Sequence, residues 1–187
     1  MPGWAVPDDA VLTELAPLDA VLSRHAAALA GDFAAYRNHA YRVANLCASR
    51  SPGGPEAIEK IATAAAFHDL GIWTARTFDY LEPSASLARE YLVGAGRAAW
   101  VPEVTAAIQE HHRVTTYRGA HEWLVEPFRR ADWMDVTGGL LASGLSRALF
   151  RATVARWPRA GFHMLLARLE WRRVRTHPWS PLPMVKL

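Results

Sequence analysis

The chain contains very little cysteine, since Cys47 is its only one. A single thiol cannot form an internal disulfide or a cysteine-based zinc cluster, and this usage is typical of a reducing compartment. The sequence also lacks an N-terminal basic region followed by an apolar run, so we expect no signal peptide. No apolar run is long enough to cross a bilayer. We therefore expect a soluble, cytoplasmic protein with no membrane partner.

Strand-like alternation of apolar and polar residues is also scarce, whereas apolar residues recur at the three- and four-residue spacing of helices. The chain has 187 residues, of which 51% are hydrophobic, so one domain can bury a sizeable core. No internal repeat or low-complexity tract divides it. We therefore predict an all-α fold in which residues 1–187 form a single domain.

Proline, glycine and capping residues mark the expected ends of the helices. The predicted helices span about Asp9–Ala30 with an interruption at Pro17, Asp32–Ser49, Glu56–Asp69, Pro83–Val93, Pro102 through His112, Glu122–Val136, Ser143–Arg156 and Ala160–Arg175. Gly71 is expected to end the third of these helices, and Ile72–Glu82 is expected to be irregular. The proline-rich tail from Pro178 to Pro183 is expected to lie extended over the surface.

Charge is unevenly distributed along the chain, whose formal net charge is +3. Between Leu145 and Leu187, Glu170 is the only acidic residue beside nine basic ones: Arg147, Arg151, Arg156, Arg159, Arg168, Arg172, Arg173, Arg175 and Lys186. This basic third could attract an anionic substrate or nucleic acid, or it could dock on the acidic remainder of the fold or of a second subunit. We favour docking, which leaves a homo-oligomer open. We disfavour nucleic acid because no RNP-like aromatic pattern accompanies the charge.

Side chains with metal-ligand chemistry follow one another in three helical segments: His39, the adjacent pair His68-Asp69, and Asp132. The pair ends an otherwise apolar helix, where burying a charge is expensive unless that charge is paired or coordinated. On its own helix, His39 shares a stripe with Tyr36 and so points to the core. Two imidazoles and two carboxylates converging from three helices would hold a divalent ion and leave positions for water and substrate.

The sequence resembles the HD-domain superfamily of metal-dependent phosphohydrolases over about Phe33 to Thr137. The run His39-Ala40-Tyr41-Arg42-Val43 is similar to the His-x-x-Arg-Val run at the family's first histidine, and Ala131-Asp132-Trp133-Met134-Asp135 is similar to its Ala-Asp-x-x-Asp run. The resemblance implies an HD-fold helical bundle around residues 33–137, followed by C-terminal helices and the tail in residues 143–187. It also implies a divalent ion (Mn, Fe, Co, Ni, Mg or Zn) held by His39, His68, Asp69 and Asp132, with Asp135 as a helix-surface or supporting carboxylate.

The adjacent pair His111-His112 is similar to a His-His pair that some HD families use for a second metal or for the substrate. Ile108 lies three and four residues before these histidines, so both imidazoles can lean to one interior side. Dinuclear HD enzymes usually carry another histidine after the His-Asp pair, but no residue from Leu70 to Glu110 is His. We therefore favour a substrate-binding or supporting role for the pair. The remaining histidines lack ligand-like neighbours and are expected at ordinary surface or core positions: His25, His121, His163 and His177.

Arg42 is the candidate anion-binding side chain. It lies one helical turn from His39 and could bind a phosphate of the substrate. The alternative is a structural salt bridge with Asp69 or Asp132, and the sequence leaves both interpretations open.

The resemblance implies hydrolysis of a nucleotide or small phosphoester by a metal-activated water, so the expected partner is a small anionic substrate. The residues after the pair do not identify the general acid or base: no Glu follows shortly, as in nucleotidase-like members, and no Lys follows Gly71, as in the cyclic-dinucleotide group. Asp69 is the catalytic candidate because a carboxylate beside the metal can accept a proton. Two alternatives stay open: a diiron oxygenase or hydratase/lyase on this scaffold, and a non-catalytic binding module that metal stabilises.

Overall fold

The chain folds into an all-α bundle, which confirms the predicted fold class. The structure, a computed structural model, describes residues 11–141, 144–176, 178–179 and 183–186. Its main helices are α1 (Ala16–Arg24), α2 (Ala26–Leu29), α3 (Phe33–Ala48), α4 (Pro55–Phe67), α5 (Gly71–Thr74), α6 (Leu81–Gly94), α7 (Val101–Glu110), α8 (Glu122–Val136), α9 (Arg147–Arg156) and α10 (Phe162–Thr176). Short 3-10 turns precede α3 (Ala30–Asp32) and α7 (Ala98–Trp100). None of the described helices is long and apolar enough to cross a membrane.

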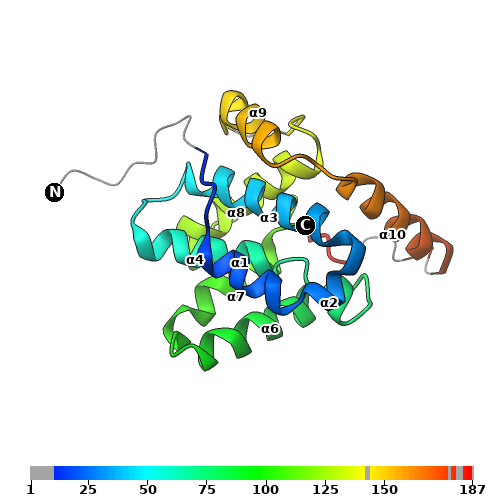
Figure 1. Cartoon of the computed structure of the whole chain (residues 1–187), viewed down its shortest axis with the longest axis horizontal. Helices are drawn as coiled ribbons and strands as arrows, with labels where there is room; N and C mark the ends of the chain where they lie inside the picture. The colour runs from blue at the N-terminus through cyan, green and yellow to red at the C-terminus, as the bar shows by residue number, and fades with distance from the viewer. Residues whose placement is uncertain (1–10, 142–143, 177, 180–182, 187) are drawn as a thin grey trace.

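Helix α3 is the centre of the bundle and packs against α1, α4, α8 and α9 (Figure 1). From His39 to Ala48 every residue of this helix is buried. A helix that is buried on all sides must satisfy its polar side chains within the protein. The polar side chains of His39, Arg42 and Asn45 therefore face other helices or loops, whereas Arg37 and Asn38, earlier on α3, are partly exposed.

The turn after α4 holds the His68-Asp69 pair and packs tightly against α6. A Cβ atom on Gly71 would lie 2.6 Å from the carbonyl oxygen of Tyr80 and 2.9 Å from Oγ of Ser84. The Gly71 amide also donates a hydrogen bond of 2.9 Å to that Ser84 oxygen. Gly71 does not end the helical region, because α5 begins at this residue. The predicted irregular segment Ile72–Glu82 is wrong to that extent.

Two other predicted helix boundaries are corrected by the structure. Pro17 does not interrupt the first helix but stands in the first turn of α1, where its missing N–H has no helical partner to lose. Helix α7 ends at Glu110, so His111 and His112 follow the helix instead of lying within it. Freed from helical geometry, the two adjacent side chains can reach the same interior site.

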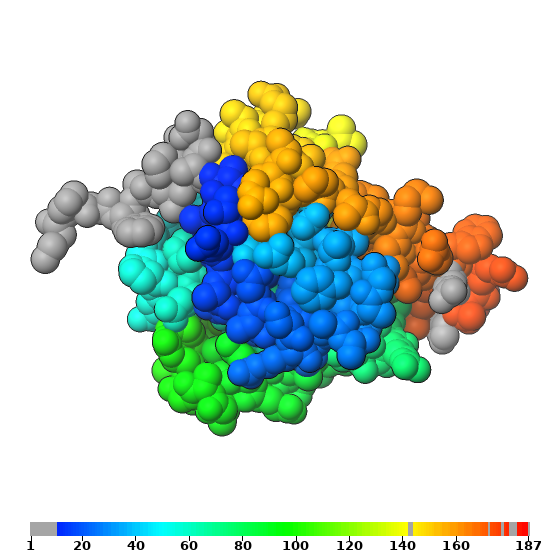
Figure 2. Space-filling model, viewed as in Figure 1, coloured from blue at the N-terminus to red at the C-terminus, as the bar shows by residue number. Residues whose placement is uncertain are grey.

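The C-terminal third lies partly on α3 and partly at one end of the bundle. Helix α9 packs on α3, and α10 projects beyond the bundle in the views of Figures 1 and 2. The apolar side chains of Leu149, Phe150 and Phe162 are buried. Several arginines of the two helices are exposed, namely Arg147, Arg151, Arg156, Arg168 and Arg175. Because these arginines face water, the expected docking of the basic third on the acidic remainder of this chain is wrong for them.

The end of the chain returns to the bundle. The amide of Val114 donates to the carbonyl oxygen of Lys186 at 2.8 Å, and Nζ of Lys186 lies 2.8 Å from Oε1 of Glu110. Met184 is buried in this contact region. Residues 178–179 and 183–184 form turns, which differs from the extended tail that was expected. His177, Ser143 and residues 180–182 lie outside the described residues.

Gly71→Ala should lower the free energy of unfolding by about 1–3 kcal/mol, because the added methyl group meets backbone of α6 at overlapping distance. Gly94→Ala is the matched control: Gly94 lies in the last turn of α6, and no neighbouring side chain or packed backbone lies within 4 Å of the position that its Cβ atom would take. This second substitution should be neutral or stabilising by up to about 1 kcal/mol. Urea unfolding of both variants checks the difference, and equal stabilities would contradict the packing argument.

Candidate metal centre

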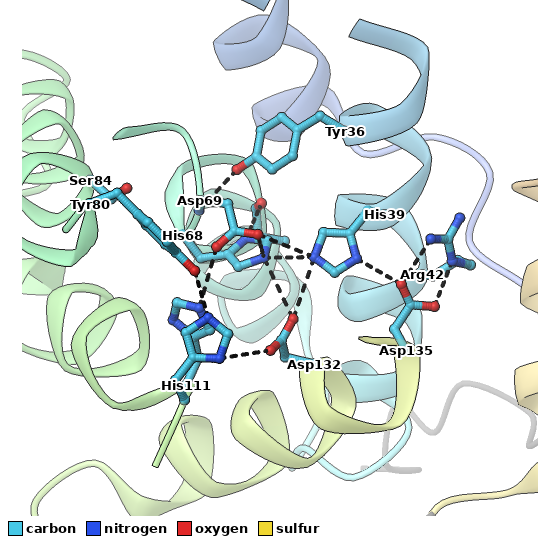
Figure 3. Close-up of polar contacts among 12 residues, drawn as sticks. Tyr36, His39, Arg42, His68, Asp69, Tyr80, Ser84, His111, Asp132 and Asp135 are labelled. Atoms are coloured by element: carbon cyan, nitrogen blue, oxygen red, sulfur yellow. Dashed lines mark hydrogen bonds and ion pairs between the residues drawn. The ribbon is translucent and has the colours of Figure 1, made fainter. Parts of the chain in front are cut away.

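Histidine and aspartate side chains from four parts of the bundle point to one buried centre (Figure 3). The members of this cluster are His39 on α3, His68 and Asp69 after α4, His111 and His112 after α7, and Asp132 on α8. Relative exposure is 0–3% for each of them except His112, whose side chain is 15% exposed. The structure thus brings together every residue that the sequence proposed as a ligand, and both histidines of the later pair.

One side of the cluster is formed by His39, His68 and Asp69, a group whose ligand atoms lie close enough to share a metal ion. The Nε2 atoms of His39 and His68 are 2.9 Å apart. Oδ2 of Asp69 lies 3.6 Å from the first and 3.4 Å from the second. Oδ1 of Asp132 faces the same point, 3.4 Å from Nε2 of His39.

The other side of the cluster is formed by Asp69, His111 and His112, a second group that could hold an ion. Nε2 of His111 lies 3.4 Å from Oδ1 of Asp69. Nδ1 of His112 lies 3.7 Å from Oδ2 of Asp132. The two oxygens of Asp69 therefore face different groups, and those of Asp132 do the same. Each carboxylate is placed to bridge two positions.

Every imidazole of the cluster has its other ring nitrogen held by a hydrogen-bond partner. The pairs are His39 Nδ1 with Asp135 Oδ2 at 2.7 Å, His68 Nδ1 with Ala65 O at 2.8 Å, His111 Nδ1 with Ile108 O at 2.6 Å, and His112 Nε2 with Tyr80 Oη at 2.6 Å. A carbonyl oxygen only accepts, so His68 and His111 carry their protons on Nδ1 and present the lone pair of Nε2 to the centre. Histidine ligands of metals are oriented in this way.

Buried atoms without partners show that the residues fit a cation. Among the described residues, Asp69 Oδ1, His111 Nε2, and both oxygens of Asp132 are buried and accept no hydrogen bond. No Lys or Arg of the described chain pairs with Asp69 or Asp132. Leaving such acceptors and charges unsatisfied in the interior is costly. A divalent ion between them would satisfy all of these atoms at once.

The pKa values agree with a ligand set. Burial lowers the pKa of His68 to about 4. Burial, with the neighbouring His111, lowers the pKa of His112 to about 3, so both rings are neutral at pH 7. Burial opposes the charge of Asp69, but the imidazoles of His68 and His111 hold its pKa below the usual range. Neutral imidazoles and ionised carboxylates are the forms that bind metals.

His39 and His111 are the exceptions, because burial would lower their pKa values but the carboxylates beside them raise these values above the usual range. Burial alone would lower the pKa of His39, but its hydrogen bond with Asp135 and the nearby negative charges of Asp132 and Asp135 raise that pKa to about 9. In the absence of a metal, a proton on His39 partly balances the buried negative charge. A metal ion and this proton would therefore occupy the same place between His39 and Asp132.

Arg42 does not face the cluster. Its Nε and Nη2 atoms donate to the two oxygens of Asp135 at 2.6 and 2.8 Å, and its Nη1 donates to the carbonyl oxygen of Trp157 at 2.9 Å. The side chain is fully buried, and Figure 3 shows it on the far side of Asp135 from the cluster. The prediction that Arg42 binds substrate is therefore wrong. The salt-bridge alternative is correct in kind, with Asp135 as the partner instead of Asp69 or Asp132.

Asp135 and two tyrosines support the cluster, and of these three residues the sequence indicated a supporting role only for Asp135, as one of two alternatives. Asp135 is buried between His39 and Arg42, so the helix-surface alternative for it is wrong. The Tyr36 hydroxyl donates to the carbonyl oxygen of Ala66 at 3.0 Å and accepts from the Asp69 amide at 3.2 Å. Tyr36 shares the stripe of His39, which could have identified it. Tyr80 lies in the segment that was expected to be irregular, where no pattern indicated a role.

Comparisons with known proteins return no match to a protein-family model, a curated protein or a solved structure. The order of the histidines and aspartates in this chain and the geometry of their cluster are therefore the features that bear on function.

Asp69→Ala should abolish metal binding, because Asp69 is the one residue that belongs to both ligand groups. His112→Ala removes a ligand from one group only, and the bound metal should fall to about half of the wild-type content. His25→Ala, a histidine outside the cluster, is the control and should keep the full content. Elemental analysis of protein purified without chelator measures this series. Full occupancy in Asp69→Ala would refute the assignment.

Arg42→Ala should destabilise the protein by about 3–5 kcal/mol, because it leaves Asp135 buried without its bidentate cationic partner. Arg89→Ala is the matched control, since Arg89 and Glu82 form an exposed ion pair at 3.9 Å that should contribute no more than about 1 kcal/mol. Urea unfolding gives both values. A stable Arg42→Ala protein with only a weakened affinity for substrate would contradict the structural role.

Proposed function

We propose that the chain is a metal-dependent phosphohydrolase of the HD superfamily, and that its centre holds two divalent ions. The observation that carries the proposal is the set of buried, unpartnered acceptor atoms on Asp69, His111 and Asp132. These atoms belong to an ordered series of motifs that resembles the HD pattern from His39 to Asp132. The resemblance supports the reaction class, and the unpartnered atoms support the ions.

The adjacent pair His111-His112 supports a second ion, in place of the substrate-binding role favoured from the sequence. The absence of a histidine between Leu70 and Glu110 is a weaker objection to a second ion when both members of the pair lie near the cluster. His111 lies beside Asp69 and His112 lies beside Asp132. Two histidines that leave the end of α7 together can supply the nitrogen ligands that other dinuclear members draw from two separate segments.

The proposed chemistry is attack of water on the phosphorus of a phosphoester, which breaks the bond from phosphorus to the ester oxygen and releases phosphate and an alcohol that takes up a proton. Divalent ions would supply Lewis acidity and a nucleophilic water at neutral pH. The chain's own carboxylates orient the site: the two oxygens of Asp69 face opposite ligand groups, which makes Asp69 the residue that defines the distance between the groups. Oδ1 of Asp69 is also a buried acceptor without a hydrogen-bond partner, and we assign to it the proton that leaves the water.

The negative charge of the substrate would be balanced by the ions and not by a guanidinium. Arg42 is engaged by Asp135 and two backbone carbonyls, so it has no free donor directed at the cluster. His112 is the only cluster member with appreciable exposure, which supports entry of the substrate from its side. Substrate identity in this proposal is limited to a small phosphoester, including nucleotides.

A diiron oxygenase is the second candidate, because one observation favours it. The six residues of the cluster would offer imidazole and carboxylate ligands to both ions, and such ligands suit redox-active iron as well as manganese or magnesium. Hydrolysis stays the first proposal because it requires no electron donor or oxygen path.

Protein loaded with manganese, cobalt or magnesium should release phosphate from at least one member of a panel of nucleotides and sugar phosphates. Asp69→Ala should reduce that release by at least about 100-fold, because it removes a shared ligand and the proton acceptor together. Phosphate release at fixed metal occupancy is the measurement. Oxygen uptake by the iron-loaded protein without phosphate release would favour the oxygenase, and full metal content with neither activity would favour a non-catalytic module.

A further inference from the structure

A cavity of about 370 Å³ lies beside His112, between α8, α10 and the end of the chain. This volume is in the range of small-molecule sites. The cavity shares His112 and Tyr80 with the metal centre. A molecule in it would therefore lie next to the most exposed member of the cluster.

Aromatic rings form a continuous wall of this cavity. Phe78 and Tyr80 have ring centroids 6.1 Å apart, Tyr80 and His112 are also 6.1 Å apart, and His112 and Trp133 are 6.3 Å apart. All four rings line the cavity. The faces of such rings carry partial negative charge and attract cations.

The charged and polar residues of the cavity are also suited to a cation. Glu170 is its only charged lining residue, and no Arg or Lys contributes to the described lining. Glu170 is exposed on α10, and no ion pair joins it to another described residue. A wall of rings with one carboxylate would repel an anionic group and favour a positive one.

His163 adds a second acceptor. Its Nε2 atom lies 3.2 Å from the carbonyl oxygen of Asp135, which can only accept, so the proton is on Nε2 and the lone pair is on Nδ1. That Nδ1 atom is buried and has no partner among the described residues. The side chain lines the cavity. The polar groups with unused capacity, Glu170 and His163, are therefore acceptors.

We propose that this cavity binds an organic ammonium group, and that it selects substrates in which such a group is joined to the phosphoester. The second part rests on the proposed function, whereas the binding of the ammonium group does not. In this arrangement the negative end of the substrate would meet the metal centre at His112, and the positive end would contact Phe78, Trp133 and Glu170.

Choline and 3,3-dimethylbutanol are suitable probes, because they have nearly the same shape and differ in the charge of the trimethylammonium and tert-butyl groups. Calorimetry with the metal-loaded protein should show choline binding at least about tenfold more tightly. Phosphocholine should likewise be hydrolysed with a higher kcat/KM than 3,3-dimethylbutyl phosphate. Equal affinity for the two alcohols, or tighter binding of the neutral one, would overturn the proposal.

Two variants test the residues that supply the preference. Glu170→Gln should reduce the ratio of choline to 3,3-dimethylbutanol affinity by about threefold or more, and Glu90→Gln, an exposed glutamate on α6, should leave it unchanged. Phe78→Leu keeps an apolar wall but removes a ring, so it should weaken choline binding while sparing the neutral probe. Wild-type metal content and unfolding temperature in each variant verify that the fold is intact. An unchanged ratio in both Glu170→Gln and Phe78→Leu would refute the assignment of these residues.

The two proposals can fail separately. Preferential choline binding without hydrolysis of any phosphoester would contradict the phosphohydrolase and leave the ammonium site supported. Hydrolysis of phosphoesters without preference for the cationic probe in binding or turnover would contradict the ammonium site and leave the phosphohydrolase supported.

Discussion

The burial of Asp69 and Asp132 with no Lys or Arg partner in the described part of the chain is the constraint on which the interior of this protein depends. Two carboxylates at 3% and 1% relative exposure repel each other and have lost the solvation that water provides. The surrounding imidazoles compensate part of this negative charge. The pKa of His39 is raised and the pKa values of both aspartates are lowered for this reason. A divalent ion would compensate more fully. Helices α3, α4, α7 and α8 thus surround a site that favours positive charge.

The second layer of contacts follows from the same electrostatics. Asp135 orients His39 through Nδ1, and this third carboxylate needs its own counter-ion in the interior. Arg42 supplies that charge through two hydrogen bonds, and its remaining donor is taken up by the carbonyl oxygen of Trp157, which follows α9. The pair therefore connects the metal centre to the C-terminal helices. It also explains why a positive residue so near the cluster is not available to a substrate.

The sequence predicted those helices and site residues that a local motif or a repeated spacing of apolar residues indicates. The three- and four-residue spacing indicated α3 and α8 and the inward direction of His39 and Asp132, and the adjacent His68-Asp69 pair followed an apolar helix. Arg42 was ambiguous because it lies one turn from His39 on a helix that is buried on all sides there, and only the placement of Asp135 on another helix decides which way its side chain turns. Helix α5 has four residues, too few to show periodicity. The role of Tyr80 depends on His112, 32 residues away, a contact that no local pattern indicates.

The positions of the charges also constrain what can approach the centre. Five arginines of α9 and α10 face water: Arg147, Arg151, Arg156, Arg168 and Arg175. The guanidinium of Arg42 is closed off by Asp135, and Glu170 is the only charged residue among the described ones that line the cavity beside His112. In the proposed enzyme, the positive charge that attracts a substrate would therefore come from bound ions, and it would act over a short range because the cluster is buried. A substrate with a single compact anionic group suits this distribution better than one that is anionic along its length. The same wall of rings that would hold a cationic end would exclude a second phosphate from the cavity.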